Sequence, residues 1–118
     1  MEDIAPQITR QRLLIEANYN IEVTEKTIKD YLLQLAGTLN LRIYGEPVIH
    51  SPSGEGKDIN QGFDAFVSLI DSGIALYIWT NEKFLSCVIY TCKSFSYEEA
   101  TKFTEKFFNT SKLVFKEF

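Results

Sequence analysis

The fold is decided between residues 63 and 92, which read FDAFVSLIDSGIALYIWTNEKFLSCVIYTC. Apolar and polar side chains alternate along this stretch, and two groups of turn-forming residues, Asp71-Ser72-Gly73 and Asn81-Glu82-Lys83, divide it into three segments. Alternation with a period of two is typical of strands that are buried on one face. The segments lie too close together in sequence for parallel crossovers, so they predict an antiparallel sheet of hairpins.

Two further strands and a helix are predicted upstream of this stretch. Residues 11–20 open with the apolar-rich run RLLIEA and predict a first strand. Thr24 predicts the N-cap of a helix that ends within residues 37–40. The apolar residues of this helix recur at helical spacing and are Ile28, Leu32, Leu35 and Leu39. Residues 41–50 predict a second strand. Pro47 favours a position at the edge of the sheet or a bend over a central position.

The last helix and strand are predicted downstream. Ser96 and Glu99 have the spacing of a capping box. The helix that follows has an apolar stripe of Ala100, Phe103 and Phe107. Asn109 ends this helix, and residues 113–118 suit a final strand. The order is therefore β-α-β-β-β-β-α-β. Since two amphipathic helices cover only one face of one sheet, we expect an α+β fold, a two-layer α/β sandwich with a mainly antiparallel sheet.

The face of the sheet away from the helices carries large aromatic side chains. Depending on the register of the strands, these are Tyr77, Trp79 or Phe66. An apolar patch of this kind on a sheet face is typical of a surface that binds a partner or a ligand. A partner sheet, a homodimer interface and a ligand platform are all consistent with this pattern.

Length and composition restrict the function classes. The chain has 118 residues, of which 45% are hydrophobic, so we expect a single globular domain, residues 1–118. Its 12 Lys and Arg against 16 Asp and Glu give a net charge of −4, which argues against nucleic acid and anionic membranes as partners. One His and two Cys are too few for a zinc cluster or a disulfide framework, so no metal is expected.

The cysteines and the amino-terminal residues predict a cytoplasmic location. Cys87 and Cys92 lie five residues apart in one predicted strand, so their side chains should point to opposite faces and cannot pair. Free thiols favour a reducing compartment. The start, Met1-Glu2-Asp3, is acidic where a secretory signal is basic. No stretch approaches the about 20 apolar residues that span a bilayer.

Taken one at a time, the polar features favour structural interpretations. The loop of residues 51–58 is dense in turn-forming residues, but its Gly54-Glu55-Gly56-Lys57 lacks the spacing of a phosphate-binding loop. His50 is the only imidazole, and a lone His is more often structural than catalytic. On its own, Asp71-Ser72-Gly73 predicts a hairpin turn. Cys92 on its own is interpreted as a small buried apolar side chain.

The arrangement of these features resembles a known family. An acidic residue and a serine in a tight turn, Asp71-Ser72, are followed by a strand that contains Trp79 and by a strand that ends in Thr91-Cys92. This pattern, with its spacings, resembles the core of the short prokaryotic S-adenosylmethionine decarboxylases, which are pyruvoyl enzymes of polyamine (spermidine) synthesis. The segment RLLIEA also looks like the opening strand of that family, so the resemblance covers nearly the whole chain.

The resemblance implies a self-cleaving proenzyme. The hydroxyl of Ser72 would attack the carbonyl of Asp71, and elimination from the resulting ester would break the chain there and leave a pyruvoyl group at residue 72. Its ketone would condense with the substrate amine and accept the electrons released with carbon dioxide. Cys92 would return a proton to the substrate carbon, and Gly73 would let the turn adopt a strained conformation. S-adenosylmethionine is the implied substrate. A homodimer is the expected assembly, because the single layer of helices leaves the aromatic face of the sheet uncovered.

Two positions depart from the pattern of the family. Tyr77 stands where the family has a His that assists cleavage and contacts substrate, and Asp64 stands where it has a second Ser that assists cleavage. We assign both as candidate catalytic residues, and His50 and Glu82 as candidate substrate-binding residues. A phenol is a poor base at neutral pH, and a carboxylate opposes a developing oxyanion. A non-processing relative that binds a metabolite or regulates a partner therefore stays open as an alternative.

Overall fold

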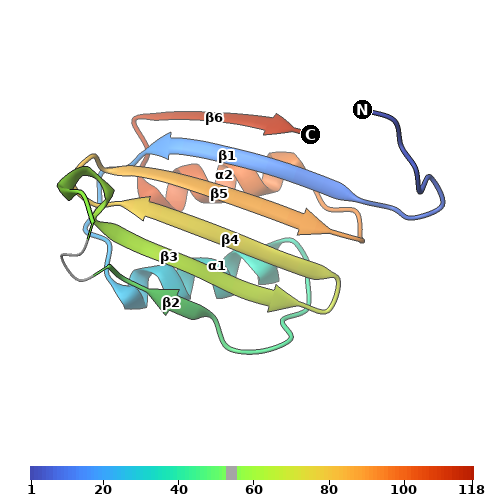
Figure 1. The fold of residues 1–118 in the computed structure, drawn as a ribbon, viewed down its shortest axis with the longest axis horizontal. Helices are drawn as coiled ribbons and strands as arrows, with labels where there is room; N and C mark the ends of the chain where they lie inside the picture. Colours follow the sequence, from blue (N-terminus) through green and yellow to red (C-terminus); the bar gives the residue numbers. More distant parts are fainter. Residues whose placement is uncertain (53–55) are drawn as a thin grey trace.

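A computed structural model describes residues 1–52 and 56–118, and within them one six-stranded sheet has both α-helices on the same face (Figure 1). Every strand pair is antiparallel, and the order across the sheet is β2-β3-β4-β5-β1-β6. The strands are β1 (Gln11–Asn18), β2 (Val48–His50), β3 (Gly62–Leu69), β4 (Ser72–Trp79), β5 (Phe84–Thr91) and β6 (Lys112–Glu117). The helices are α1 (Glu25–Thr38), α2 (Tyr97–Phe108) and the short 3₁₀ helix η1 (Asp58–Asn60). The predicted two-layer α+β fold and its element order are confirmed.

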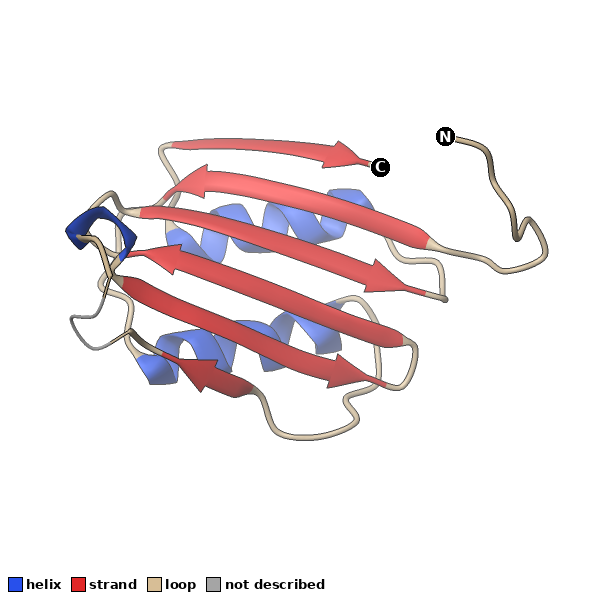
Figure 2. Ribbon diagram, in the orientation of Figure 1, coloured by secondary structure: helices blue, strands red, loops and turns tan. Residues whose placement is uncertain are grey.

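The two faces of the sheet have different environments (Figure 2). The face under the helices is closed and apolar, and its fully buried side chains include Leu13, Ile15, Val67, Ile74, Leu76, Leu85 and Ile89. Along β3, Ala65, Val67 and Leu69 are buried, whereas Asp64 and Phe66 are exposed on the other side. The predicted alternation of the central strands is therefore confirmed, and one face remains open.

The strand predicted for residues 41–50 is much shorter than expected. Only Val48–His50 pairs with β3, and Ile43 adds one isolated bridge to Leu69. Gly45 and Pro47 interrupt the segment, because proline has no N–H to donate to a ladder. Its predicted position at an edge is confirmed. The predicted loop that follows contains residues 53–55, which lie outside the described residues.

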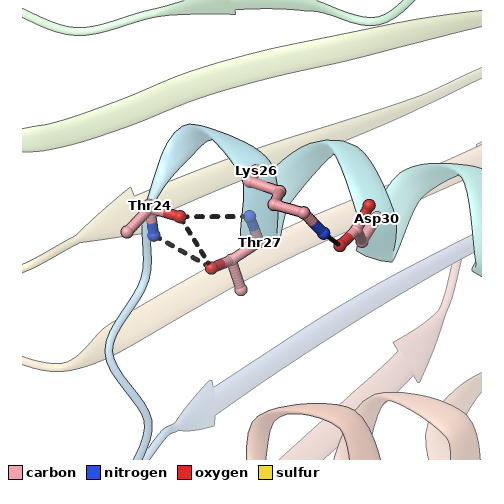
Figure 3. A network of polar contacts seen from close by, with 4 residues as sticks. All are labelled: Thr24, Lys26, Thr27 and Asp30. Carbon is pink, nitrogen blue, oxygen red and sulfur yellow. Dashed lines mark hydrogen bonds and ion pairs between the residues drawn. The ribbon is translucent and has the colours of Figure 1, made fainter.

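Both helices begin at side-chain caps. The hydroxyl of Thr24 accepts a hydrogen bond from the Thr27 N–H at 3.3 Å, and the Thr27 hydroxyl accepts one from the Thr24 N–H at 3.1 Å (Figure 3). Ser96 caps α2 by accepting from the Glu99 N–H at 3.1 Å. These bonds satisfy amide donors that the first helical turn leaves without partners, so the predicted starts of both helices are confirmed.

One polar cluster is buried between the helices and the sheet. The hydroxyl of Tyr31 on α1 hydrogen-bonds the hydroxyl of Thr104 on α2 at 2.7 Å and donates to the Cys87 sulfur on β5 at 3.7 Å. All three side chains are fully buried. Burial raises the pKa of the Cys87 thiol to about 12, because the charged thiolate has no water around it. This cluster ties both helices to the sheet.

Candidate functional site

The β3–β4 hairpin determines where Ser72 lies. Leu69 pairs with Ser72, so the turn consists of Ile70 and Asp71, and Ser72 is the first residue of β4. The predicted turn, Asp71-Ser72-Gly73, is therefore wrong in two of its three residues, because Ser72 and Gly73 belong to β4 and the turn begins at Ile70. The register of the pairing decides this, since Ser68 and Gly73 already face each other as partners in the ladder.

Ser72 has a strained backbone. Its φ is 129°, a value that side chains larger than that of glycine rarely adopt. The expectation that Gly73 supplies the unusual conformation is wrong, because its φ does not lie in the left-handed region. Glycine at position 73 leaves room for the ring of Phe66 instead. A Cβ there would lie 2.4 Å from Cζ of Phe66 on β3, well inside van der Waals contact.

Cys92 contacts Ser72 and Asp71 through two different groups. It follows the last residue of β5, Thr91, which pairs with Ser72 across the ladder. The Cys92 sulfur lies 3.4 Å from the Ser72 hydroxyl oxygen. The Cys92 backbone N–H donates to the carbonyl oxygen of Asp71 at 2.8 Å. A nucleophilic hydroxyl, the carbonyl that precedes it and a donor to that carbonyl are thus held together at one end of the sheet.

The Asp71 side chain points toward a cation. Its Oδ2 is buried, accepts no hydrogen bond from the described residues and lies 4.0 Å from a guanidinium nitrogen of Arg42. The Arg42 carbonyl accepts a hydrogen bond from the Ile70 N–H at 2.9 Å, so the Arg42 segment also holds the backbone of the turn. Sequence reasoning missed Arg42, because its contact with the hairpin depends on the irregular path of residues 42–46.

Tyr77, Asp64 and His50 form a row across three strands of the open face. Asp64 pairs with Tyr77 on one side and with His50 on the other. Directly paired side chains in antiparallel strands share a face and lie close enough to interact. The three line a hollow of about 370 Å³ together with Val48, Ala65 and Phe66.

The row lies far from Ser72 of the same chain. Tyr77 is five residues further along β4, which corresponds to about 16 Å of strand. No side chain of the row spans that distance. Of the candidate catalytic residues, the fold therefore brings Ser72 and Cys92 together and separates Tyr77 and Asp64 from them.

Glu82 lies at the opposite end of the sheet. It belongs to the β4–β5 turn and lines a hollow of about 360 Å³ with Trp79, Phe84 and residues of β1 and η1. Trp79 is seven residues from Ser72 along β4, or about 23 Å. The fold does not bring Glu82 near Ser72.

A third hollow adjoins Ser72 itself. It has a volume of about 270 Å³ and is lined by Phe66, Ser72, Gly73, Ala75, Val88 and Tyr90. Apart from Ser72, its lining is aliphatic or aromatic. The alternation of apolar and polar residues predicts that Phe66 and Tyr90 lie in strands. Only the register of β3, β4 and β5 shows that both lie beside Ser72.

The described residues hold neither a metal-binding group nor a membrane-spanning helix. Within residues 1–52 and 56–118, no three His, Cys, Asp or Glu side chains are grouped so that they could hold a metal ion. In the same residues, neither helix is long and apolar enough to cross a membrane.

The fold and sequence were compared with known proteins. The crystal structure of the adenosylmethionine decarboxylase from Aquifex aeolicus is similar with a TM-score of 0.73, covering 94% of this chain and 89% of that chain at 14% identity. At this identity the likeness concerns the fold alone. No curated protein matches the sequence. The profile of the family described as S-adenosylmethionine decarboxylase matches residues 14–118. The chain therefore belongs to the S-adenosylmethionine decarboxylase family.

Proposed function

We propose that this chain is a self-cleaving decarboxylase that acts in polyamine synthesis, with S-adenosylmethionine as the first substrate to test. Membership of the family supports the reaction class. The observation that carries the proposal is the geometry at Ser72. Its backbone is strained, its hydroxyl contacts the Cys92 sulfur, and the carbonyl before it accepts a hydrogen bond from the Cys92 N–H.

These contacts support self-cleavage. The Ser72 hydroxyl oxygen attacks the carbonyl carbon of Asp71, and negative charge develops on the carbonyl oxygen. The N–H of Cys92 already donates to that oxygen, so it stabilises the charge without reorganisation. Breaking the peptide bond to Ser72 yields an ester and releases the backbone strain at φ 129°. Elimination from the ester then separates residues 1–71 from residues 72–118.

The same contacts suit the decarboxylation. A ketone at residue 72 supplies an electron sink for the loss of carbon dioxide from an amine substrate. The apolar hollow beside Ser72 would place aliphatic and aromatic side chains against one side of it and reduce its contact with water. The Cys92 thiol is exposed and lies 3.4 Å from the Ser72 hydroxyl oxygen, so it can donate a proton to the product carbon.

Tyr77 and Asp64 are proposed to act on a second copy of the chain. Within one chain they lie about 16 Å from Ser72 along the strand, too far for contact. Two copies could pack with their open faces together and their strands running in opposite directions. The row of Tyr77, Asp64 and His50 in one chain would then lie over Ser72 of the other. The exposed rings of Phe66, Tyr77 and Tyr90 on that face support such a homodimer. His50, beside Asp64, would then reach the substrate as well.

The alternative is a relative that does not cleave itself and binds a metabolite. The residues that favour it are Tyr77 and Asp64, since neither a phenol nor a carboxylate replaces the base and the hydroxyl of the family. The intact mass of freshly purified protein, measured under denaturing conditions and again after days, separates the two functions. Fragments 1–71 and 72–118 support self-cleavage, whereas a single uncut chain supports the alternative.

Matched variants assign the roles. Ser72→Ala abolishes cleavage, whereas Ser68→Ala, on the neighbouring strand, leaves it intact. Cys92→Ala spares cleavage, since its backbone N–H remains, and impairs turnover. A fully active Cys92→Ala enzyme would show that the thiol is not the proton donor.

Mixed chains test whether the site is shared. Neither Ser72→Ala nor Tyr77→Ala should cleave when purified alone. In mixed dimers the Tyr77→Ala chain should be cut, because its partner supplies the tyrosine. A mixture that stays uncut would place Tyr77 outside the cleavage machinery of a second chain.

A further inference from the structure

The ring of Phe66 is seated directly on Gly73, beside the residue proposed to cleave the chain. An ideal Cβ at Gly73 would lie 2.4 Å from Cζ and 2.6 Å from Cε1 of the ring. The ring therefore occupies the volume that any other side chain at position 73 would need. The same ring forms one wall of the hollow beside Ser72 and separates it from the hollow that holds Asp64, His50 and Tyr77.

The ester at Ser72 has two competing fates. In elimination, the proton on Cα of residue 72 is removed, the Cβ–Oγ bond breaks, and its electron pair leaves on the carboxylate of Asp71. The resulting dehydroalanine rearranges to an imine, takes up water and loses ammonia to give the ketone, and the proton lost from Cα leaves with the ammonia as ammonium. In hydrolysis, water adds to the ester carbonyl, and the products are the Asp71 carboxylate and an unmodified serine at the new amino terminus. Water competes only at the ester, because the later hydration has no rival path.

We propose that Phe66 directs this ester toward elimination by excluding water from Ser72. The other side chains of the hollow are small or lie across it, namely Gly73, Ala75, Val88 and Tyr90. The hollow beside Ser72 is open on its outer side. Without the ring it would widen and join the polar hollow next to it, so more water would reach Ser72. The proposal rests on the proposed self-cleavage and adds to it a residue that determines which product forms.

Phe66 is separate from the packing that maintains the fold. It lies on the open face and is 47% exposed, whereas the core lies under the helices on the other face. Its neighbours in the ladder are Val48 and Ala75. Replacing it should therefore change the environment of Ser72 while leaving the sheet and helices intact.

Two different variants disrupt the same contact. Phe66→Ala removes the ring, and Gly73→Ala displaces it, because the new methyl group takes its position and the ring is the far end of a half-exposed side chain. The double variant should be no worse than either single one, since both changes remove one interaction. Phe66→Leu keeps apolar bulk and should behave nearly as the natural protein. Phe115→Ala on β6, where the ring is 49% exposed, is the matched control.

The readout is the mass of the 72–118 fragment, which distinguishes a pyruvoyl from a serine amino terminus. We expect the ratio of serine to pyruvoyl ends to rise about tenfold in Phe66→Ala and in Gly73→Ala, a change of about 1.4 kcal/mol between two barriers. Phe66→Leu and Phe115→Ala should keep the natural ratio. Thermal unfolding of each variant verifies that the fold is retained.

Three other outcomes overturn the proposal, and they are distinguishable. An unchanged ratio in Phe66→Ala, with cleavage intact, shows that the ring does not exclude water, and self-cleavage still stands. Additive effects in the double variant show that Phe66 and Gly73 act separately. A natural chain that never cleaves removes the proposed function and, with it, the role of Phe66.

Discussion

The two faces of the sheet differ in what keeps their side chains in place. Under the helices, aliphatic side chains from β1, β3, β4 and β5 are closed off from water and pack against α1 and α2. On the open face, three aromatic side chains and one aliphatic side chain are between 39% and 53% exposed, namely Tyr77, Tyr90, Phe66 and Val48. The first surface accounts for stability. The second holds the hollow beside Ser72 and the hollow lined by Tyr77, Asp64 and His50, and it contributes little to the core.

The largest expected difference in unfolding free energy is between substitutions at two neighbouring residues of β5. Ile89 is fully buried, and Ile89→Ala should lower the free energy of unfolding by about 2–5 kcal/mol, because it removes apolar contacts and leaves a cavity. Tyr90, on the opposite face, is 39% exposed, and Tyr90→Ala should cost about 1 kcal/mol or less in the monomer. Urea unfolding at low protein concentration measures both. Equal losses would show that the open face is part of the core.

The buried polar cluster gives the next largest effect. Thr104→Val removes the 2.7 Å partner of the Tyr31 hydroxyl and leaves that hydroxyl with only the Cys87 sulfur. We expect a loss of about 1–3 kcal/mol, the cost of a buried group deprived of its hydrogen bond. The double variant Tyr31→Phe/Thr104→Val should recover most of the loss, since nothing is then unsatisfied. A double variant as unstable as Thr104→Val alone would assign the effect to packing.

Alkaline pH should weaken the covered face through Cys87. Burial raises the pKa of its thiol from 9.0 to about 12, so the unfolded chain releases the proton first. Stability is then fully present below pH 9 and falls between pH 9 and 12, by up to about 1.4 kcal/mol per pH unit from this one group. Unfolding between pH 9 and 10 should show this slope in the natural protein and a flatter one in Cys87→Ala. Equal slopes would exclude the thiol as the cause.

The contrast between the faces also explains which features the sequence could predict. The period of two along β3, β4 and β5 follows from burial on one side, so it identified the strands, their inward side chains and the fold class. Hairpins constrain pairing, and the family resemblance pointed to Ser72 and Cys92, which do lie together. Caps at Thr24 and Ser96 are local, so they were predictable too.

What escaped prediction depends on contacts between elements or on backbone detail. The sequence does not reveal the positive φ of Ser72. The neighbouring Gly73 suggested that the unusual backbone conformation would lie one residue later. The contact of the Phe66 ring with Gly73 can be predicted only when the register of β3 and β4 is known. The separation of Tyr77 and Asp64 from Ser72 is visible only once β4 is known to run straight away from the turn. The short β2 reflects an irregular path that local propensity does not define.

The smallest expected effect concerns the helix that covers one half of the closed face. Thr24→Ala removes one hydroxyl of the reciprocal cap of α1 and should cost about 1 kcal/mol. Two residues away, Lys26 forms an exposed ion pair with Asp30, and Lys26→Ala should cost only about 0.3 kcal/mol, because water screens the pair. Chemical unfolding of both variants measures the difference. Raising the salt concentration should diminish the effect of Lys26→Ala and leave that of Thr24→Ala unchanged, since the cap satisfies a backbone donor rather than a pair of charges.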